Sequence, residues 1–198
     1  MKIGLVPISA KPYHAGHHYL IETAAAENDE VIVFASTSDR KRTGEFPIEG
    51  SVMVEVWNEL IVPNLPENVS VRLGGSPVRE VYEMIASSCD AIPTQDFTAS
   101  DESEVPHTFT VYSDVVDTKS NYPVESRKKY MNPLYERGGV LFAAESNPSS
   151  YIRGSQAPAV RGEDLRRCLE QRDYLAFSKL VPSCISHVKY WDKLTRVV

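Results

Sequence analysis

The sequence has few cysteines, and their positions indicate neither a disulfide framework nor a metal site. Cys89, Cys168 and Cys184 are odd in number and widely separated, without the short paired spacings of a zinc site or of a disulfide scaffold. This cysteine usage excludes a small disulfide-stapled fold and predicts a protein of a reducing compartment.

The chain also has no long apolar run and no excess of positive charge. The apolar residues 3–9 are too short a run for the core of a signal peptide, and no stretch approaches the ~20 apolar residues of a membrane span. With 21 Lys and Arg against 27 Asp and Glu, the formal net charge is -6, so no overall positive field would attract nucleic acid or an anionic membrane. We therefore expect a soluble, cytoplasmic protein without nucleic-acid or membrane partners, in which any phosphate site is local.

What the sequence does contain is an alternation of strand and helix patterns. An apolar run at 2–8 predicts a buried central strand, and helix formers at 18–26 followed by an apolar run at 31–35 complete a strand-helix-strand unit. The alternation continues with predicted helices at 50–62 and 77–86 and predicted strands at 69–73, 109–112 and 140–144. It predicts an α/β fold with a Rossmann-like parallel sheet and helices on both faces.

Helical patterns dominate the last part of the chain. They lie near 162–171, 174–180 and 185–194, and polar stretches at 93–107 and 145–158 are predicted loops. With 198 residues, 42% of them hydrophobic, we expect one domain over 1–198, with 160–198 as its helical C-terminal part. Trp57 and Trp191 lie at helical spacing from apolar neighbours and are expected in the core.

Three of the five histidines fall within residues 14–18, at the junction between the first predicted strand and the helix that follows it. At such a junction, free backbone N–H groups and the helix dipole favour an anion, and Gly16 would let a phosphate approach the backbone. Imidazole N–H donors on His14 and His17 could stabilise the charge of a phosphoryl-transfer transition state. Lys11 could add a fixed charge and Ser9 a hydroxyl from the same loop.

Two other interpretations of these histidines remain open at this point. His14, His17 and His18 could bind zinc, although no companion cysteines or metalloprotease-type His-Glu motif accompany them. They could also simply cap and pack the helix.

The segment His14-Ala15-Gly16-His17 resembles the HxGH signature of the nucleotidylyltransferase superfamily, which includes nicotinamide-mononucleotide, phosphopantetheine and glycerol-phosphate nucleotidyltransferases. Many members precede this signature with Gly-Ser/Thr-Phe-x-Pro. Here Ser9 and Pro12 keep that register, whereas Ile8 and Ala10 replace the Gly and the Phe.

A second resemblance lies late in the chain. Adenylyltransferases of the superfamily carry Ile-Ser-Gly-Thr-x-x-Arg at the start of a helix that grips the triphosphate, and here Gly162 and Arg166 keep the spacing. Arg161 and Glu163 replace the Ser and the Thr. A carboxylate repels a triphosphate whereas a hydroxyl can donate to it, so either Arg161 helps to rebuild the phosphate contacts or the fold has outlived its activity.

The resemblance implies a Mg²⁺-dependent transfer of a nucleotidyl group from ATP, or from CTP, to a phosphorylated small molecule with release of pyrophosphate. His14 and His17 would stabilise the transition state, Lys11 and Arg166 would neutralise phosphates, and phosphates and water would hold the metal in place of protein ligands. The nucleotide-binding residues would be Ser9, Gly16, Arg161, Gly162 and Arg166. The acceptor is first expected to resemble nicotinamide mononucleotide, with a cytidylyltransferase as the close alternative.

The acceptor's phosphate is expected at Ser38, Arg40 and Arg42, which follow the second strand at the carboxyl edge of the sheet, where open α/β folds bind ligands. Ser113-Asp114 and the basic residues 127–129 are weaker candidates at that edge. The rival hypotheses are a non-catalytic structural or assembly protein that reuses the fold and a nucleotide sensor without turnover. A homo-oligomer or a larger assembly is left open.

Overall fold

The computed structural model describes residues 1–90, 108–113, 117, 120–121, 141–142 and 158–196. The predicted loop at 93–107, nearly all of the polar stretch at 145–158, and the candidate residues Asp114 and 127–129 lie outside the described residues.

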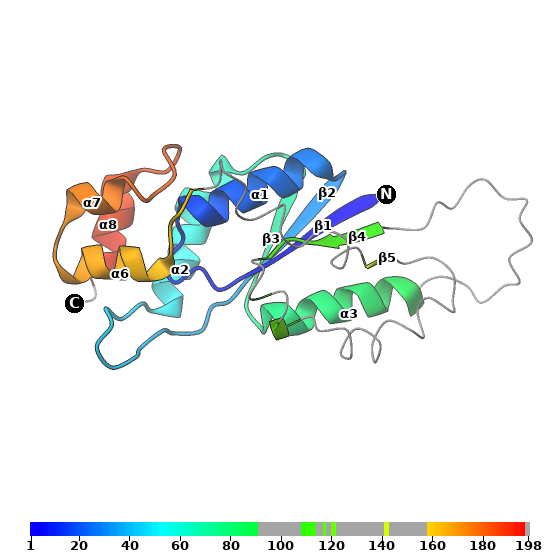
Figure 1. Ribbon diagram of the computed structural model, residues 1–198, viewed down its shortest axis with the longest axis horizontal. Coiled ribbons are helices and arrows are strands. Elements are labelled where there is room, and N and C mark those ends of the chain that lie inside the picture. Colours follow the sequence, from blue (N-terminus) through cyan, green and yellow to red (C-terminus); the bar gives the residue numbers. More distant parts are fainter. Residues whose placement is uncertain (91–107, 114–116, 118–119, 122–140, 143–157, 197–198) are drawn as a thin grey trace, which may run out of the picture.

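Five parallel strands form one sheet in the order β3-β2-β1-β4-β5 (Figure 1). Their bounds are β1 Lys2–Ile8, β2 Glu30–Ala35, β3 Val69–Leu73, β4 Thr108–Val111 and β5 Leu141–Phe142. The predicted central strand is central, because Leu5 of β1 pairs with Ile32 on one side and with Val111 on the other. The strand order reverses between β1 and β4, and open α/β sheets bind ligands at the carboxyl side of such a reversal.

Helices cover both faces of this sheet. Helix α1, Ala15–Glu27, packs Ile21 against the face that includes Val6 of β1, while α3, Pro77–Asp90, packs Val81 against the opposite face, which includes Leu5. Neighbouring residues of β1 therefore serve different cores, as the period-two alternation of a strand requires. This arrangement confirms the predicted Rossmann-like α/β fold.

The predicted helix at 50–62 is less regular than the sequence suggested. It consists of α2, Gly50–Val56, a π-helical turn at Trp57–Ile61 and a 3-10 turn at Val62–Asn64. Pro63 within the last turn has no N–H to continue an α-helical ladder. Trp57 is fully buried, as predicted.

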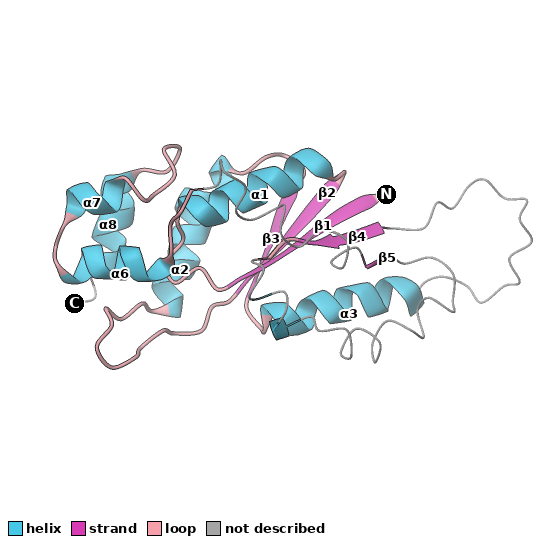
Figure 2. Ribbon diagram, viewed as in Figure 1, coloured by secondary structure: helices cyan, strands magenta, loops and turns pink. Residues whose placement is uncertain are grey.

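The C-terminal segment is helical, as predicted, and gathers on the side of the sheet where β1 ends (Figure 2). Its helices are α6 Gly162–Glu170, α7 Tyr174–Ser178 and α8 His187–Thr195. The buried side chains of this segment join the same apolar cluster as α1, and Trp191 packs at the edge of that cluster against Phe177. Within the described part of the chain, no helix is long and apolar enough to cross a membrane.

Hydrogen bonds fasten this helical segment to the loop after β1 and to the start of α1. The Tyr190 hydroxyl donates to the carbonyl of Tyr13 at 2.8 Å, and the Ala15 N–H donates to the carbonyl of Leu180 at 2.9 Å. The start of α1 is therefore held from the C-terminal side of the sequence.

Candidate functional site

Two adjoining cavities lie beyond the carboxyl end of β1. The first, of about 240 Å³, is bounded by the end of β1, the first turns of α1, the residues after β4 and the segment that leads into α6. The second, of about 350 Å³, shares with the first Ser9, His14, His17, Asp117, Arg161 and Gly162, and adds Ala10, Lys11, Arg40, Glu163 and Arg166. We call the second one the basic cavity, because four cationic side chains line it against two carboxylates.

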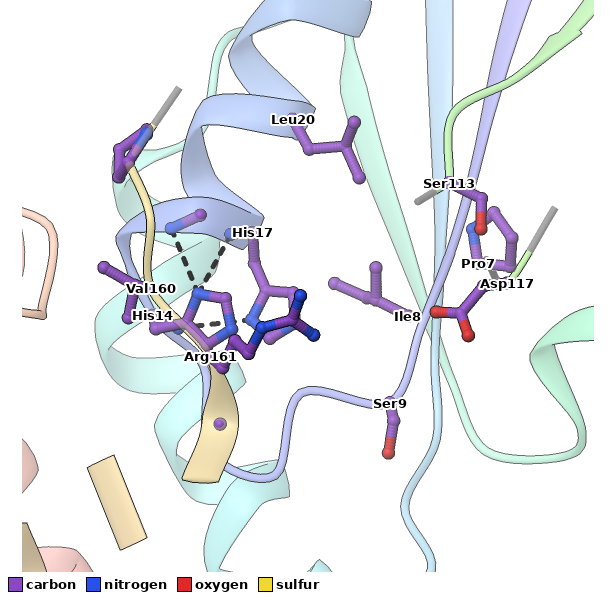
Figure 3. Close-up of a pocket in the computed structure, with 13 residues that line it drawn as sticks. Pro7, Ile8, Ser9, His14, His17, Leu20, Ser113, Asp117, Val160 and Arg161 are labelled. Atoms are coloured by element: carbon purple, nitrogen blue, oxygen red, sulfur yellow. Dashed lines mark hydrogen bonds between the residues drawn. The ribbon is translucent and has the colours of Figure 1, made fainter. Parts of the chain in front are cut away.

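His14 and His17 cap helix α1 reciprocally. Nδ1 of His14 accepts hydrogen bonds from the N–H groups of Gly16 at 3.0 Å and His17 at 3.3 Å, while Nδ1 of His17 accepts from the His14 N–H at 3.2 Å (Figure 3). A ring nitrogen that accepts an N–H carries no proton of its own. Both neutral rings therefore carry their proton on Nε2 and present a donor there.

This cap changes the expected anion site at the helix end. The Ala15 N–H donates to Leu180, and those of Gly16 and His17 donate to His14, so the backbone donors predicted to be free for a phosphate are already used. Gly16 lines the first cavity, and a Cβ there would also lie 2.9 Å from Cε1 and Nδ1 of His14. The start of α1 thus offers imidazole donors in place of backbone N–H groups.

The two rings stack with their centroids 3.7 Å apart and their planes at 21°. Burial, together with the neighbouring His14 ring, holds the pKa of His17 well below its ordinary value of 6.5. His17 is therefore a neutral hydrogen-bond donor at physiological pH.

The third histidine of the cluster has a different environment. His18 is buried, with Nδ1 2.8 Å from the Tyr13 hydroxyl and Nε2 3.2 Å from Glu22. It is not among the residues that line either cavity. Among the described residues, no group of three or more His, Cys, Asp or Glu is placed to hold a metal ion.

Lys11 is buried at the edge of the basic cavity. Its Nζ donates to the carbonyl oxygens of Ser9, at 3.1 Å, and Ser36, so it sits between the ends of β1 and β2. Burial lowers the pKa of Lys11 to about 8, although nearby Asp39 partly offsets that effect. The ammonium group is still charged at neutral pH.

The start of α6 faces the same cavity, and two of its backbone donors have no partner among the described residues. The Arg161 N–H donates to the Asp164 carboxylate at 3.0 Å, whereas the N–H groups of Gly162 and Glu163 donate to none of the described residues. The Arg161 side chain lies on the same wall of the cavity as His14 and His17 (Figure 3).

Arg166 crosses from α6 to the loop after β1. Its Nη1 donates to the Lys11 carbonyl at 2.6 Å, and a Cβ on Gly162 would lie 2.9 Å from that nitrogen. The guanidinium is buried and lines the basic cavity. The structure therefore places Arg161, Glu163 and Arg166 around the same cavity as the two capping histidines.

The three predicted acceptor residues are separated. Arg40 lines the basic cavity and forms a two-point ion pair with Glu45. Ser38 is exposed, with its hydroxyl 2.8 Å from that of Ser36, and Arg42 is exposed as well. Neither Ser38 nor Arg42 is among the lining residues of the described cavities.

Sequence reasoning missed Asp117 and gave Ser113 little weight. Both line the first cavity opposite the histidines (Figure 3), and both line a further cavity of about 330 Å³ that extends toward Val78 of α3. Ser113 follows β4 at the carboxyl edge, which is a usable signal. Asp117 belongs to no motif, so only the folded arrangement reveals its position.

Comparison with known proteins gives one family match, in the N-terminal part of the chain. The family model of the citrate lyase ligase C-terminal domain matches residues 3–53. The chain is similar to that family there. That domain belongs to the nucleotidyltransferase-like superfamily, and the match suggests an enzyme with acetyltransferase-like or adenylyltransferase-like activity. It runs from β1 into α2 and includes His14 and His17. No curated protein matches the chain at a significant level.

Proposed function

We propose that the chain is a nucleotidyltransferase that moves a nucleotidyl group from ATP, or from CTP, to a phosphorylated small molecule and releases pyrophosphate. The observation that carries this proposal is that neutral Nε2–H donors on His14 and His17 line the same cavity as Lys11, Arg161 and Arg166. A locally basic cavity in a chain of net charge -6 favours a polyanionic ligand.

The geometry supports a reaction that needs no protein nucleophile. An oxygen of the acceptor's phosphate attacks the α-phosphorus as the bond to pyrophosphate breaks, and negative charge spreads over the non-bridging oxygens. Neutral imidazole donors in fixed rings stabilise that charge without reorganising during the step. The acceptor phosphate is already anionic, so no general base is required.

The remaining phosphates would lie against the basic cavity. Lys11, Arg161 and Arg166 supply positive charge there, and the N–H groups of Gly162 and Glu163 supply backbone donors at the positive end of α6. These groups stabilise the departing pyrophosphate.

Magnesium fits the chemistry of this lining. The carboxylates of Asp117 and Glu163 line the basic cavity, and Mg²⁺ typically combines one or two carboxylates with phosphate oxygens and water. The ion would supply charge neutralisation of the phosphates. It would also offset the repulsion between Glu163 and the triphosphate.

The test is a panel of nucleoside triphosphates and phosphorylated acceptors, with pyrophosphate release as the readout and His17→Ala as the inactive control. We expect release from at least one pair, and loss of that release in the variant. A folded protein that releases pyrophosphate from no pair contradicts the enzyme. Triphosphate binding without turnover would then indicate a sensor, and no binding together with a large permanent interface would indicate an assembly protein.

A further inference from the structure

Glu45 lies behind the arginines of the basic cavity. Its carboxylate accepts two hydrogen bonds from Arg40, from Nε at 2.8 Å and from Nη2 at 3.0 Å, and its Oε2 is 3.6 Å from Nε of Arg166. Both arginines line the cavity, whereas Glu45 is not among its lining residues. The carboxylate therefore contacts both arginines without lining the cavity itself.

The segment that carries Glu45 is anchored on both sides. Arg40 and Ile48 pair as an antiparallel bridge, with N–H to carbonyl distances of 2.8 and 2.9 Å. Phe46 and Ile48 are buried, and the Glu45 N–H donates to the Arg42 carbonyl at 3.1 Å. The backbone that carries the Glu45 side chain is therefore held in place on both sides.

The two guanidinium groups need a compensating charge. Burial, and then the proximity of Arg40, lower the pKa of Arg166, while Glu45 raises it. The hydrogen bond from Arg40 lowers the pKa of Glu45, so Glu45 is ionised at neutral pH. Nε of Arg166 is buried and has no hydrogen-bond partner among the described residues, so Glu45 holds that group by charge and holds Arg40 by hydrogen bonds.

We infer that Glu45 is a positioning residue for a polyphosphate: it orients Arg40 and Arg166 so that the N–H groups not bonded to protein face the basic cavity. A guanidinium is a rigid planar fork, so fixing one edge fixes the direction of the others. A ligand does not displace Glu45, because Glu45 stands outside the cavity. The inference rests on the proposed function for the nature of the ligand.

Glu45→Gln tests the inference by calorimetry with inorganic tripolyphosphate and with MgATP. We expect affinity to fall about tenfold, the scale of one hydrogen bond to a charged group. A residue that acted through its charge alone would give the opposite result, because removing a negative charge beside an anion site tightens anion binding. Glu45→Asp keeps the charge but shortens the reach, and we expect it to weaken binding as well.

A double-mutant cycle separates positioning from general stability. In an Arg40→Met background, Glu45→Gln should cost much less affinity than in the native chain, because one of the groups that it positions is gone. The matched control is Glu55→Gln. Glu55 also pairs with two basic residues, Arg196 at 2.9 Å and Lys193 at 3.2 Å, and all three are outside the cavity lining. This control should leave tripolyphosphate affinity unchanged, and the thermal midpoint of each variant reports its folding.

Unchanged or tighter tripolyphosphate binding in both Glu45 variants would overturn the positioning role and leave the proposed function standing. A native protein that binds neither tripolyphosphate nor MgATP would overturn both. Weaker binding in both variants, with a non-additive cycle, supports the inference.

Discussion

The starts of α1 and α6 face the same cavity but are built in opposite ways. At α1, side chains use up the backbone donors, since His14 accepts from Gly16 and His17. At α6, the N–H groups of Gly162 and Glu163 donate to none of the described residues. A closed helix end and an open one therefore meet at a single site.

The difference indicates that the two helix ends have different tasks, turnover at α1 and ligand binding at α6. The capped rings of His14 and His17 are rigid, and each presents one donor in a fixed place, which suits the small charge shift of a transition state. The open end of α6 combines backbone donors with Arg161 and Arg166, which suits a ligand with several phosphate oxygens. We expect substitutions on the α1 side to affect turnover and those on the α6 side to affect binding.

The largest effect is expected at His14. In His14→Asn the amide oxygen can still cap α1, so we expect the free energy of unfolding to be kept while turnover falls by about 10², the scale for one lost transition-state donor. His14→Ala should lose that turnover and also about 1 kcal/mol of stability. Pyrophosphate release and urea unfolding measure the two quantities, and a fully active Asn variant would show that the imidazole donor is dispensable.

Gly16 at the start of α1 and Gly162 at the start of α6 allow a matched comparison of the two helix ends. In Gly162→Ala, the new Cβ would lie 2.9 Å from Nη1 of Arg166, so we expect triphosphate affinity to fall about tenfold with turnover less affected. In Gly16→Ala, the Cβ would lie 2.9 Å from the His14 ring, so turnover should fall more than affinity. Titration of each variant with MgATP checks this, and equal losses of affinity and turnover in both would break this division of tasks.

The pKa of His17 predicts how stability depends on pH. The unfolded chain takes up a proton near pH 6.5, but folded His17 does so only at much lower pH, so the stability from this group is fully present above pH 6.5. It should be lost as the pH falls from 6.5 toward the folded pKa, with a slope of at most about 1.4 kcal/mol per pH unit. Urea unfolding at a series of pH values should show this slope in the native protein and a reduced one in His17→Gln.

The smallest effect is expected from Lys11. Because its pKa is about 8, its charge is present below pH 8 and lost above it. Triphosphate affinity should then fall about two- to fivefold between pH 7 and pH 9, the scale of a single partly solvated ion pair. Lys11→Met should bind more weakly at pH 7 and lack this step in a calorimetric titration.

Local patterns predicted the framework of the fold. The apolar run of β1 and the alternating apolar and polar residues of β3 end at turn-forming residues, so their bounds at Lys2–Ile8 and Val69–Leu73 follow from the sequence. Helix α1 begins three residues before its predicted start at 18. That start was missed because the cap is a histidine ring, which is not among the usual capping side chains.

The candidate site was predictable where a motif marks it or where a residue follows a strand, as Arg40 and Ser113 do. His14, His17 and Arg166 carry recognisable spacings, and the structure places them around one cavity. Glu45 and Asp117 carry none, because the roles proposed for them depend on segments that meet only after the sheet has formed. Long-range contacts of this kind leave no periodic signal in a single sequence.

The bonds from Tyr190 to the Tyr13 carbonyl and from Ala15 to the Leu180 carbonyl also set an order of assembly during translation. The ribosome makes the histidine loop early and its supports late, and chains emerge at roughly 5–20 residues per second. About ten seconds or more therefore pass between synthesis of this loop and synthesis of residues 180–190, which hold it in place. Until then, a nascent chain holds the site's first motif but lacks the scaffold that fixes it.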